Sequence, residues 1–220
     1  MNISQFIRLI NGKRTVILTD DDYGVITLIC HCIKDEEVLR RPIYNVIFTD
    51  NMHRRFILIA NSIIKEKPYL EEILRSIRII KIGRSKGEFF TEPIGFIDIT
   101  RGLNYIFNSL KDYLNSIEEE SIVLFWGFQN LAYIFSEKGI WKNFMNMSAD
   151  IKPLTEIYIG YIRDIEDYKR FFDIVVTIRR IEEFLLKPER VYDVYVEYSI
   201  LRELPPMPLF RIVEDQLQEI

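Results

Sequence analysis

Cysteine and histidine are scarce in this chain of 220 residues. The two cysteines, Cys30 and Cys32, stand two positions apart and cannot join distant parts of a fold by a disulfide, so nothing indicates an oxidising compartment. Two histidines, His31 and His53, are too few for a zinc site of ordinary composition and give little material for acid–base catalysis. We therefore expect a cytoplasmic protein that holds no metal and no other cofactor.

Long apolar runs are missing as well. The longest, residues 122–128, is far shorter than the roughly 20 residues that span a bilayer. Residues 1–12 mix polar and apolar side chains and lack the continuous apolar stretch and cleavage site of a signal peptide. These absences predict a protein without a membrane partner.

Charge of one sign is not in excess, and alanine occurs only three times. A net charge of -4 lacks the basic surplus of a dedicated nucleic-acid binder. Apolar residues make up 48% of the chain and charged residues 28%, which is typical of a globular protein. The abundance of isoleucine, lysine, arginine and glutamate suits a hyperthermophile, and AT-biased coding also produces it.

Strand and helix patterns alternate along most of the chain. Apolar runs predict strands at 15–19, 44–48, 78–82, 96–99, 121–126, 155–161 and 173–178. Helical periodicity predicts helices at 3–10, 23–34, 52–65, 69–75, 129–137, 140–147 and 165–171, with the clearest helix after Thr100, its expected cap. Residues 191–200 and 208–213 read as late strands split by prolines, a predicted antiparallel hairpin at the sheet edge. This order predicts one α/β domain over residues 1–220.

The first strand and helix stand where a phosphate-binding P-loop would lie. Its pattern is glycine, four residues, glycine, lysine and serine or threonine. Laid over this junction, the pattern covers Thr19, Asp20, Asp21, Asp22, Tyr23, Gly24, Val25 and Ile26. Only Gly24 matches. Valine cannot neutralise phosphate charge, isoleucine cannot ligate Mg²⁺, and three carboxylates repel an anion. The same aspartates also suit an ordinary helix cap or, less well, a divalent cation.

A second nucleotide-handling position is altered too. A Walker-B strand ends in an aspartate that holds Mg²⁺, but the strand at 121–126 ends in Trp126, followed by Gly127. No carboxylate stands there. We therefore expect no catalytic residue and no ATP binding of the usual P-loop kind.

The order of the predicted elements resembles the RecA/KaiC-like family of P-loop ATPases. Shared features are an amino-terminal helix, a phosphate-loop strand, a second strand followed by Asp50, a long helix before the Walker-B strand, and a terminal hairpin. The chain is also similar to an uncharacterised archaeal family, of Thermococcales type, with a RecA-like core and no known activity. The resemblance covers about residues 15–213. It implies a three-layer RecA-like domain with a mostly parallel central sheet and a C-terminal antiparallel hairpin.

A fold of this family without its nucleotide motifs predicts a catalytically inactive domain that acts in assembly or regulation. Its partner would be a second copy or another RecA-like protein. The first alternative is an accessory nucleic-acid binder, in which the basic loop residues contact phosphate and an aromatic residue stacks on a base. Its candidate residues are Lys81, Arg84, Lys86 and Phe89. The second alternative is small-ligand binding in the remodelled nucleotide cleft through Asp20, Asp22 or Asp50.

Each functional interpretation has a structural one beside it. The basic loop also reads as a solvated turn, and residues 204–209, rich in proline, read as a rigid turn or as a docking segment. Cys30 and Cys32 point about 200° apart on a helix, so we expect core cysteines and no metal site there.

Overall fold

Two groups of residues in the chain form separate compact units. The computed structural model describes residues 3–35, 38, 40–136, 139–149, 151, 154–161, 166–181, 190–199, 208–213 and 216–219. Unit 1 combines Met1–Arg41 with Ile157–Ile220, and unit 2 is the continuous segment Pro42–Glu156. The single domain expected over residues 1–220 stays a prediction.

Unit 2 is built on parallel strands. They are β2 (Ile43–Phe48), β3 (Arg78–Gly83), β4 (Gly95–Asp98) and β5 (Ile122–Trp126). Their order is β5-β2-β3-β4, and every pair among them is parallel. All six residues of β2 and all five of β5 are buried, as expected of central strands covered on both faces.

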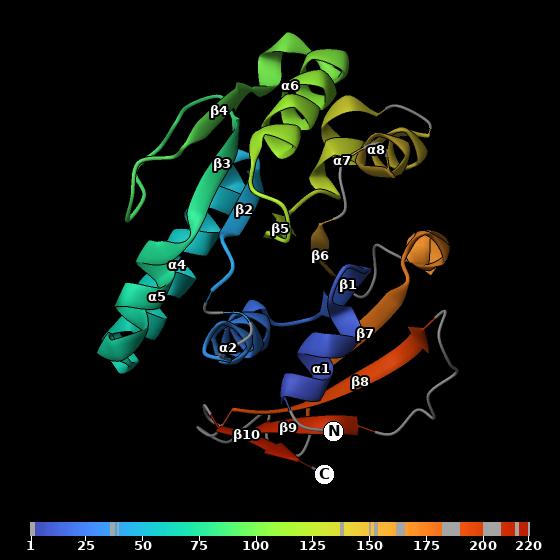
Figure 1. Ribbon diagram of the computed structural model, residues 1–220. Coiled ribbons are helices and arrows are strands. Elements are labelled where there is room, and N and C mark those ends of the chain that lie inside the picture. Colours follow the sequence, from blue (N-terminus) through green and yellow to red (C-terminus); the bar gives the residue numbers. More distant parts are fainter. Residues whose placement is uncertain are drawn as a thin grey trace. The chain divides into compact units, whose positions relative to one another are not determined.

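Helices cover both faces of this parallel sheet (Figure 1). Neighbouring side chains on a strand point to opposite faces. The Phe125 ring lies 5.9 Å from Phe144 in α8 (Ile140–Ala149), whereas the next residue, Trp126, lies 5.5 Å from Phe56 in α4 (Asp50–Glu66). Therefore α4 and α8 pack on opposite sides of β5. The other helices among the described residues of unit 2 are η1 (Pro68–Leu70), α5 (Glu71–Ser76), η2 (Ile99–Arg101), α6 (Leu103–Ser116) and α7 (Asn130–Phe135).

The start of α6 differs from the prediction. Thr100 does not cap this helix but lies in a separate 3-10 turn, η2 (Ile99–Arg101). The Asp98 carboxylate accepts hydrogen bonds from the Thr100 backbone N–H at 2.9 Å and from its hydroxyl at 2.7 Å, which fixes that turn. Gly102, at φ 88°, then precedes the first residue of α6. The predicted cap was wrong because Asp98 caps a 3-10 turn that contains Thr100, so α6 begins only at Leu103.

Unit 1 joins the two ends of the chain. Strand β1 (Arg14–Thr19) pairs in parallel with β7 (Ile174–Arg180), and β6 (Thr155–Tyr161) lies on the other side of β1. Helices α1 (Ile3–Ile10) and α2 (Asp22–Ile33) contact each other, and α2 packs on β1 and β7. The 3-10 helix η4 (Glu166–Phe171) precedes β7.

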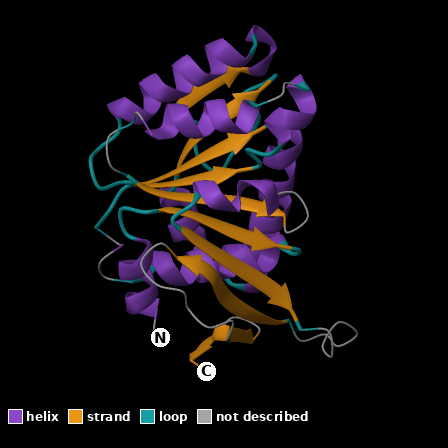
Figure 2. Ribbon diagram, turned by 90° about the vertical axis from the view of Figure 1, so that its right-hand side faces the viewer, coloured by secondary structure: helices purple, strands orange, loops and turns teal. Residues whose placement is uncertain are grey.

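The carboxyl-terminal part of unit 1 is antiparallel. Strand β7 is followed in the sheet by β8 (Val191–Ser199), β9 (Pro208–Val213) and β10 (Gln216–Glu219), each antiparallel to its neighbour. The C-terminus lies beside this antiparallel part (Figure 2). The predicted terminal hairpin is therefore confirmed, and β10 extends it by a strand that the sequence did not predict. The predicted segment at 204–209 lies mostly outside the described residues.

The observed architecture is an α/β fold with a mixed, mostly parallel sheet. Among the described helices, none combines the length and the apolar character needed to cross a membrane.

Candidate functional site

Only two residues, Asp20 and Asp21, connect β1 to α2, where the sequence pattern places a phosphate loop. The Thr19 hydroxyl accepts a hydrogen bond from the Asp21 N–H at 2.9 Å and donates one to the Asp21 carbonyl at 2.8 Å. Asp21 caps α2, because its Oδ1 accepts from the Tyr23 N–H at 2.9 Å. Two backbone N–H groups at this junction, those of Asp21 and Tyr23, are therefore already bonded to side chains, and N–H groups at a helix N-terminus are the ones that bind phosphate.

Tyrosine hydroxyls add further polar contacts at this junction. The Tyr192 hydroxyl donates a 2.8 Å hydrogen bond to Asp21 Oδ2. The Tyr161 hydroxyl lies 3.3 and 3.4 Å from the two oxygens of Asp22, a residue only 2% exposed. Burial and the bond to the Asp21 carboxylate raise the pKa of Tyr192 well above its ordinary range, so this phenol stays protonated and donating. The helix cap is thus the role that the structure gives to Asp21.

Gly24, the one match to the phosphate-loop pattern, lies inside α2 and serves packing. A Cβ atom at this position would come within 3.1 Å of both Ile178 in β7 and Tyr192 in β8. Glycine therefore lets α2 approach these strands closely. Val25 and Ile26, at the lysine and hydroxyl positions of the pattern, are 0% and 2% exposed and belong to the core.

Trp126, at the position expected for a Walker-B carboxylate, is 2% exposed. Its ring packs edge-on against Phe56 of α4. The next residue, Gly127, has φ 80°, and a Cβ atom there would lie 2.4 Å from the Met52 side chain. A tight apolar contact with α4 thus occupies the end of β5.

The predicted phosphate contact through Lys81 does not fit the structure. Lys81 is 0% exposed, and its ammonium donates to Asp50 Oδ1 at 2.7 Å and to the Ser85 carbonyl at 2.9 Å. Burial on its own would raise the pKa of Asp50, but hydrogen bonds from Lys81 and from the backbone of Arg84 and Ser85 outweigh it and lower that pKa. Lys81 therefore anchors the loop to the first turn of α4, because a buried ammonium needs such a partner.

The rest of the basic loop is divided between exposed cations and packed aromatic rings. Arg84 and Lys86 are exposed. The Phe89 ring lies 3.9 Å from the His53 ring, and His53 Nε2 lies 2.8 Å from the Glu88 carbonyl oxygen. Burial, assisted by the charge of Lys81, lowers the pKa of His53. Phe89 thus packs against α4, which leaves Arg84 and Lys86 as the accessible members of the predicted set.

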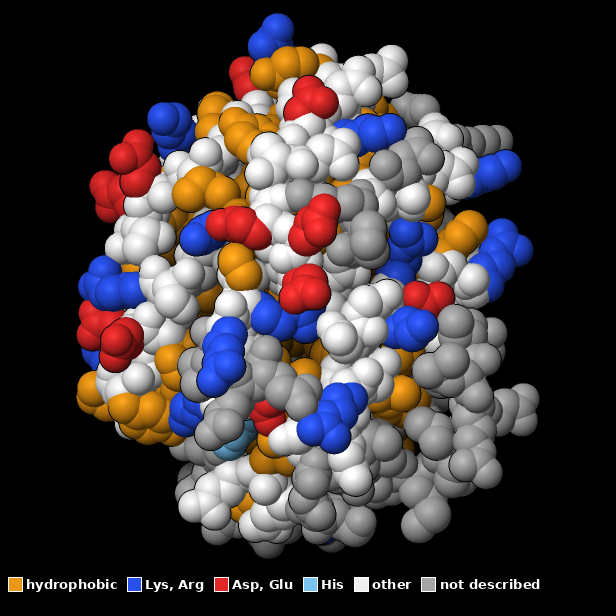
Figure 3. Space-filling model, in the orientation of Figure 1, with side chains coloured by type: hydrophobic (Ala, Val, Ile, Leu, Met, Phe, Trp, Pro, Cys, Tyr) orange, Lys and Arg blue, Asp and Glu red, His pale blue; other side chains and the backbone are white. Residues whose placement is uncertain are grey.

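Charged side chains are mixed on the face of the molecule drawn in Figure 3. Acidic and basic groups of the described residues alternate there, and neither sign gathers into a broad patch.

Cys30 and Cys32 lie where core cysteines are expected. Cys30 is buried and Cys32 partly buried, and burial raises the pKa of the Cys32 thiol, which keeps it a neutral core group. Among the described residues no group of three or more His, Cys, Asp and Glu side chains is placed to hold a metal ion.

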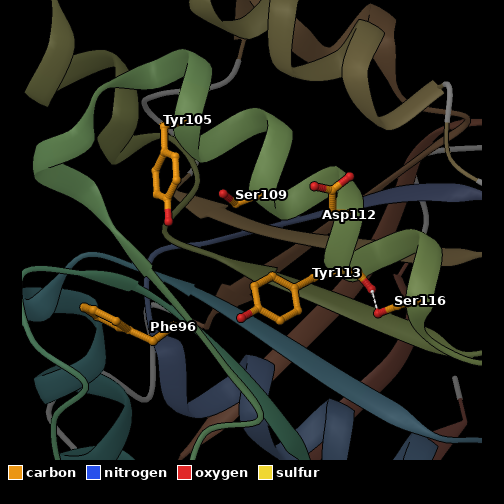
Figure 4. A pocket seen from close by; sticks show the side chains of 6 residues that line it. All are labelled: Phe96, Tyr105, Ser109, Asp112, Tyr113 and Ser116. Atoms are coloured by element: carbon orange, nitrogen blue, oxygen red, sulfur yellow. Dashed lines mark hydrogen bonds between the residues drawn. The ribbon is translucent and has the colours of Figure 1, made fainter.

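A pocket of about 380 Å³ between β4 and α6 was not predicted (Figure 4). It lies entirely within unit 2 and is lined by Phe96, Tyr105, Ser109, Asp112, Tyr113 and Ser116. Five of these residues recur at helical spacing along α6, beside the apolar stripe that the sequence analysis used. The sequence feature that could have indicated this pocket is the pair Tyr105 and Tyr113, which stand eight residues apart on the polar flank of α6.

Comparison with known proteins supports the fold. No protein-family model matches the sequence, and no curated protein matches it. A Pyrococcus horikoshii protein of no stated function has a similar structure at 12% identity, with a TM-score of 0.62, covering 94% of this chain and 97% of that chain. A KaiC-like protein from the same hyperthermophilic archaeon matches at 13% identity, with a TM-score of 0.52, covering 96% and 90%. At these identities the likeness concerns the fold alone, and it fits the predicted RecA/KaiC-like architecture.

Proposed function

We propose that the chain is a RecA-like domain that does not hydrolyse ATP and acts by association in an assembly or regulatory process. Its partner would be a second copy or another RecA-like protein. The β1–α2 connection is the observation that carries this proposal. It is two residues long, both residues are acidic, and the N–H groups of Asp21 and of Tyr23 just after it already bond to the Thr19 and Asp21 side chains.

The electrostatics of this connection oppose a nucleotide. A triphosphate placed at the start of α2 would meet the carboxylates of Asp20 and Asp21 within contact range, with the core residue Val25 in place of the lysine that normally offsets phosphate charge. Displacing the capping carboxylate would also break its bonds to Tyr23 and Tyr192. Both effects favour the unliganded arrangement.

Exposed apolar side chains support a role in association. Tyr133 and Ile134, neighbours on the short helix α7, are 67% and 49% exposed, and Leu58 on α4 is 64% exposed. Aromatic side chains such as tyrosine are enriched at interfaces and among the residues that contribute most to binding. We take the α7 pair as the contact to test first.

The proposed lack of nucleotide binding is tested by calorimetry and thermal unfolding with ATP, ADP and GTP, each with and without Mg²⁺. We expect no heat of binding and no change in melting temperature at millimolar nucleotide. A ligand that binds only the folded state must raise its stability, so a Mg²⁺-dependent rise would overturn the proposal.

The association arm is tested by sedimentation velocity over a wide concentration range. We expect a species larger than a monomer, and a shift toward monomer in the double variant Tyr133→Ser/Ile134→Ser. Leu58→Ser, which removes a comparably exposed apolar side chain from another helix, is the matched control. A wild-type monomer at every concentration, together with no association with a RecA-like protein from the same cells, contradicts the proposal.

A second candidate function is accessory nucleic-acid binding through Arg84 and Lys86. It is favoured by the way the loop is held: Lys81 bonds to the Ser85 carbonyl, Asp50 accepts from the Arg84 N–H at 3.0 Å, and His53 contacts Glu88. An ordered loop presents its two cations without a large loss of chain entropy on binding. Titration with single- and double-stranded DNA and RNA at low salt tests it. Binding that persists unchanged in Arg84→Glu/Lys86→Glu would exclude this loop as the contact.

A further inference from the structure

The pocket between β4 and α6 combines aromatic walls with a single negative charge. Phe96, Tyr105 and Tyr113 contribute rings, Asp112 contributes a carboxylate, and none of the six lining residues is basic. The close view shows Tyr105 and Tyr113 projecting from α6 on the side where Phe96 of β4 lies, whereas the carboxylate of Asp112, which also lines the pocket, points away from Phe96 (Figure 4). Aromatic faces and a carboxylate are the groups that attract an organic cation.

The position of the pocket along α6 adds to this preference. Asp112 and Ser116 stand near the C-terminal end of the 14-residue helix, where backbone carbonyls carry partial negative charge. The last turn of α6 contains no basic residue to offset that charge, and exposed Glu119 and Glu120 follow closely. Two cations stand close to this end of the helix in the sequence or the fold: Lys111, which precedes Asp112, and Arg78, whose guanidinium pairs with Glu118 just beyond the helix.

Arg101 shows that this surface holds a cation on an aromatic ring. Its guanidinium carbon lies 3.9 Å from the centre of the Tyr105 ring, a cation–π distance. Tyr113, the second tyrosine of the pocket, has no cation–π contact of this kind among those observed for the described residues. Tyr113, whose ring takes part in no such contact among the described residues, is the tyrosine next to Asp112 in the sequence.

The placement of Tyr113 is fixed by its surroundings. A Cβ atom at Gly95 would lie 2.8 Å from the tyrosine ring, so glycine at this position of β4 is what allows the ring to rest against the strand. Ser116 Oγ donates to the Tyr113 carbonyl at 2.7 Å and steadies the end of the helix. A ring held in this way is prepared for a ligand before the ligand arrives.

We propose that this pocket binds the alkylammonium group of a small organic cation. The ammonium pairs with the Asp112 carboxylate, its methylene chain lies on the Tyr113 and Phe96 rings, and the Ser109 hydroxyl accepts a remaining hydrogen bond. A volume of about 380 Å³ lies within the range of small-ligand sites. Free polyamines and lysine side chains of extended peptides share this chemistry.

Proton–nitrogen NMR titration tests the proposal with two probes, spermidine and a Gly-Lys-Gly peptide blocked at both ends. We expect saturable shifts of backbone amides in residues 95–116 with at least one probe. Spermidine binding alone indicates a free polyamine, and peptide binding of similar strength indicates a lysine side chain. No saturable, localised shift with either probe overturns the proposal.

Three variants distinguish binding of the cation in the pocket from its general attraction to an acidic surface. Asp112→Asn should weaken binding about fivefold, the upper range for an exposed ion pair, and Tyr113→Leu about threefold through the lost ring face. Glu72→Gln removes an exposed carboxylate from α5 and should leave the affinity unchanged. Equal weakening by Asp112→Asn and Glu72→Gln would show that the pocket is not the site. Each variant's spectrum also reports whether the fold is intact.

Discussion

Gly87 shows how closely the loop between β3 and β4 follows α4. Its φ is 72°, and a Cβ atom there would lie 2.2 Å from the His53 ring. Gly87→Ala should therefore lower the free energy of unfolding by about 2–4 kcal/mol, because backbone strain and a steric clash add. Gly139→Ala, at φ 83° with no atom within 4 Å of a built Cβ, carries strain alone and should cost about 1–2 kcal/mol. Urea unfolding measures both, and equal losses would mean that the His53 contact is unimportant.

The pair Lys81–Asp50 is unequal in burial, and this predicts an unequal response to mutation. The Lys81 side chain is 0% exposed and that of Asp50 is 41% exposed. Asp50→Asn leaves a buried ammonium without its counter-charge and should cost about 3 kcal/mol, whereas Lys81→Met leaves a carboxylate that water can reach and should cost about 1 kcal/mol. Equilibrium unfolding in urea gives both values. A larger loss for Lys81→Met would contradict the burial argument.

At the scale of elements, His53 connects α4 to the loop and makes stability depend on pH. Its pKa in the folded protein is lowered from 6.5, chiefly by burial, so the unfolded chain takes up the proton first. Stability is therefore complete above pH 6.5 and falls as the pH drops from there toward the lowered folded pKa. Asp50, whose pKa is lowered from 3.8, adds a separate loss at lower pH.

The variant His53→Phe keeps an aromatic ring beside Phe89 and removes the titrating group. Its free energy of unfolding, measured in urea over a series of pH values, should lack the decline that starts at pH 6.5 in the wild type. His31 is present in both proteins, so the difference between the two curves isolates His53. Identical curves would assign the decline to another group.

The elements that the sequence predicted best are those whose signal is local. The strand at 44–48 and the helix at 52–65 match β2 and α4 within a few residues, since a continuous apolar run marks the strand and helical periodicity marks the helix. Lys81 was misread because its partner, Asp50, stands 31 residues away and the sequence gives no sign of that pairing. The pocket beside α6 was missed for the same reason: Phe96 joins the helical residues only in the folded chain.

At the scale of the whole molecule, the predicted single domain has a measurable consequence. Phe6 of α1 and Phe210 of β9 pack edge to face with centroids 5.8 Å apart, and both are almost fully buried in unit 1. Phe210→Ala should cost about 3–5 kcal/mol. Both tryptophans, Trp126 and Trp141, belong to unit 2.

Tryptophan fluorescence therefore follows unit 2, whereas far-ultraviolet circular dichroism follows the whole chain. If residues 1–220 unfold as one domain, Phe210→Ala shifts the urea midpoints of both signals equally. A midpoint that moves in circular dichroism but not in fluorescence would show that the two units unfold separately and would refute the single-domain prediction.

Unit 1 combines segments from both ends of the chain, so it folds at a different stage of translation from unit 2. All of unit 2 emerges as one uninterrupted segment, so its parallel strands can pair as soon as residue 156 leaves the exit tunnel. Strand β1 is made before unit 2 but both of its neighbours in the sheet come after it: β6 starts at Thr155, and the Arg14 N–H bonds to Asp173, 159 residues later. At ordinary rates of translation that delay is about 8–30 s, during which an apolar strand stays uncovered in the nascent chain. A strand that is synthesised before unit 2 is thus covered only after unit 2 is complete, and it is the segment on which a ribosome-associated chaperone would act.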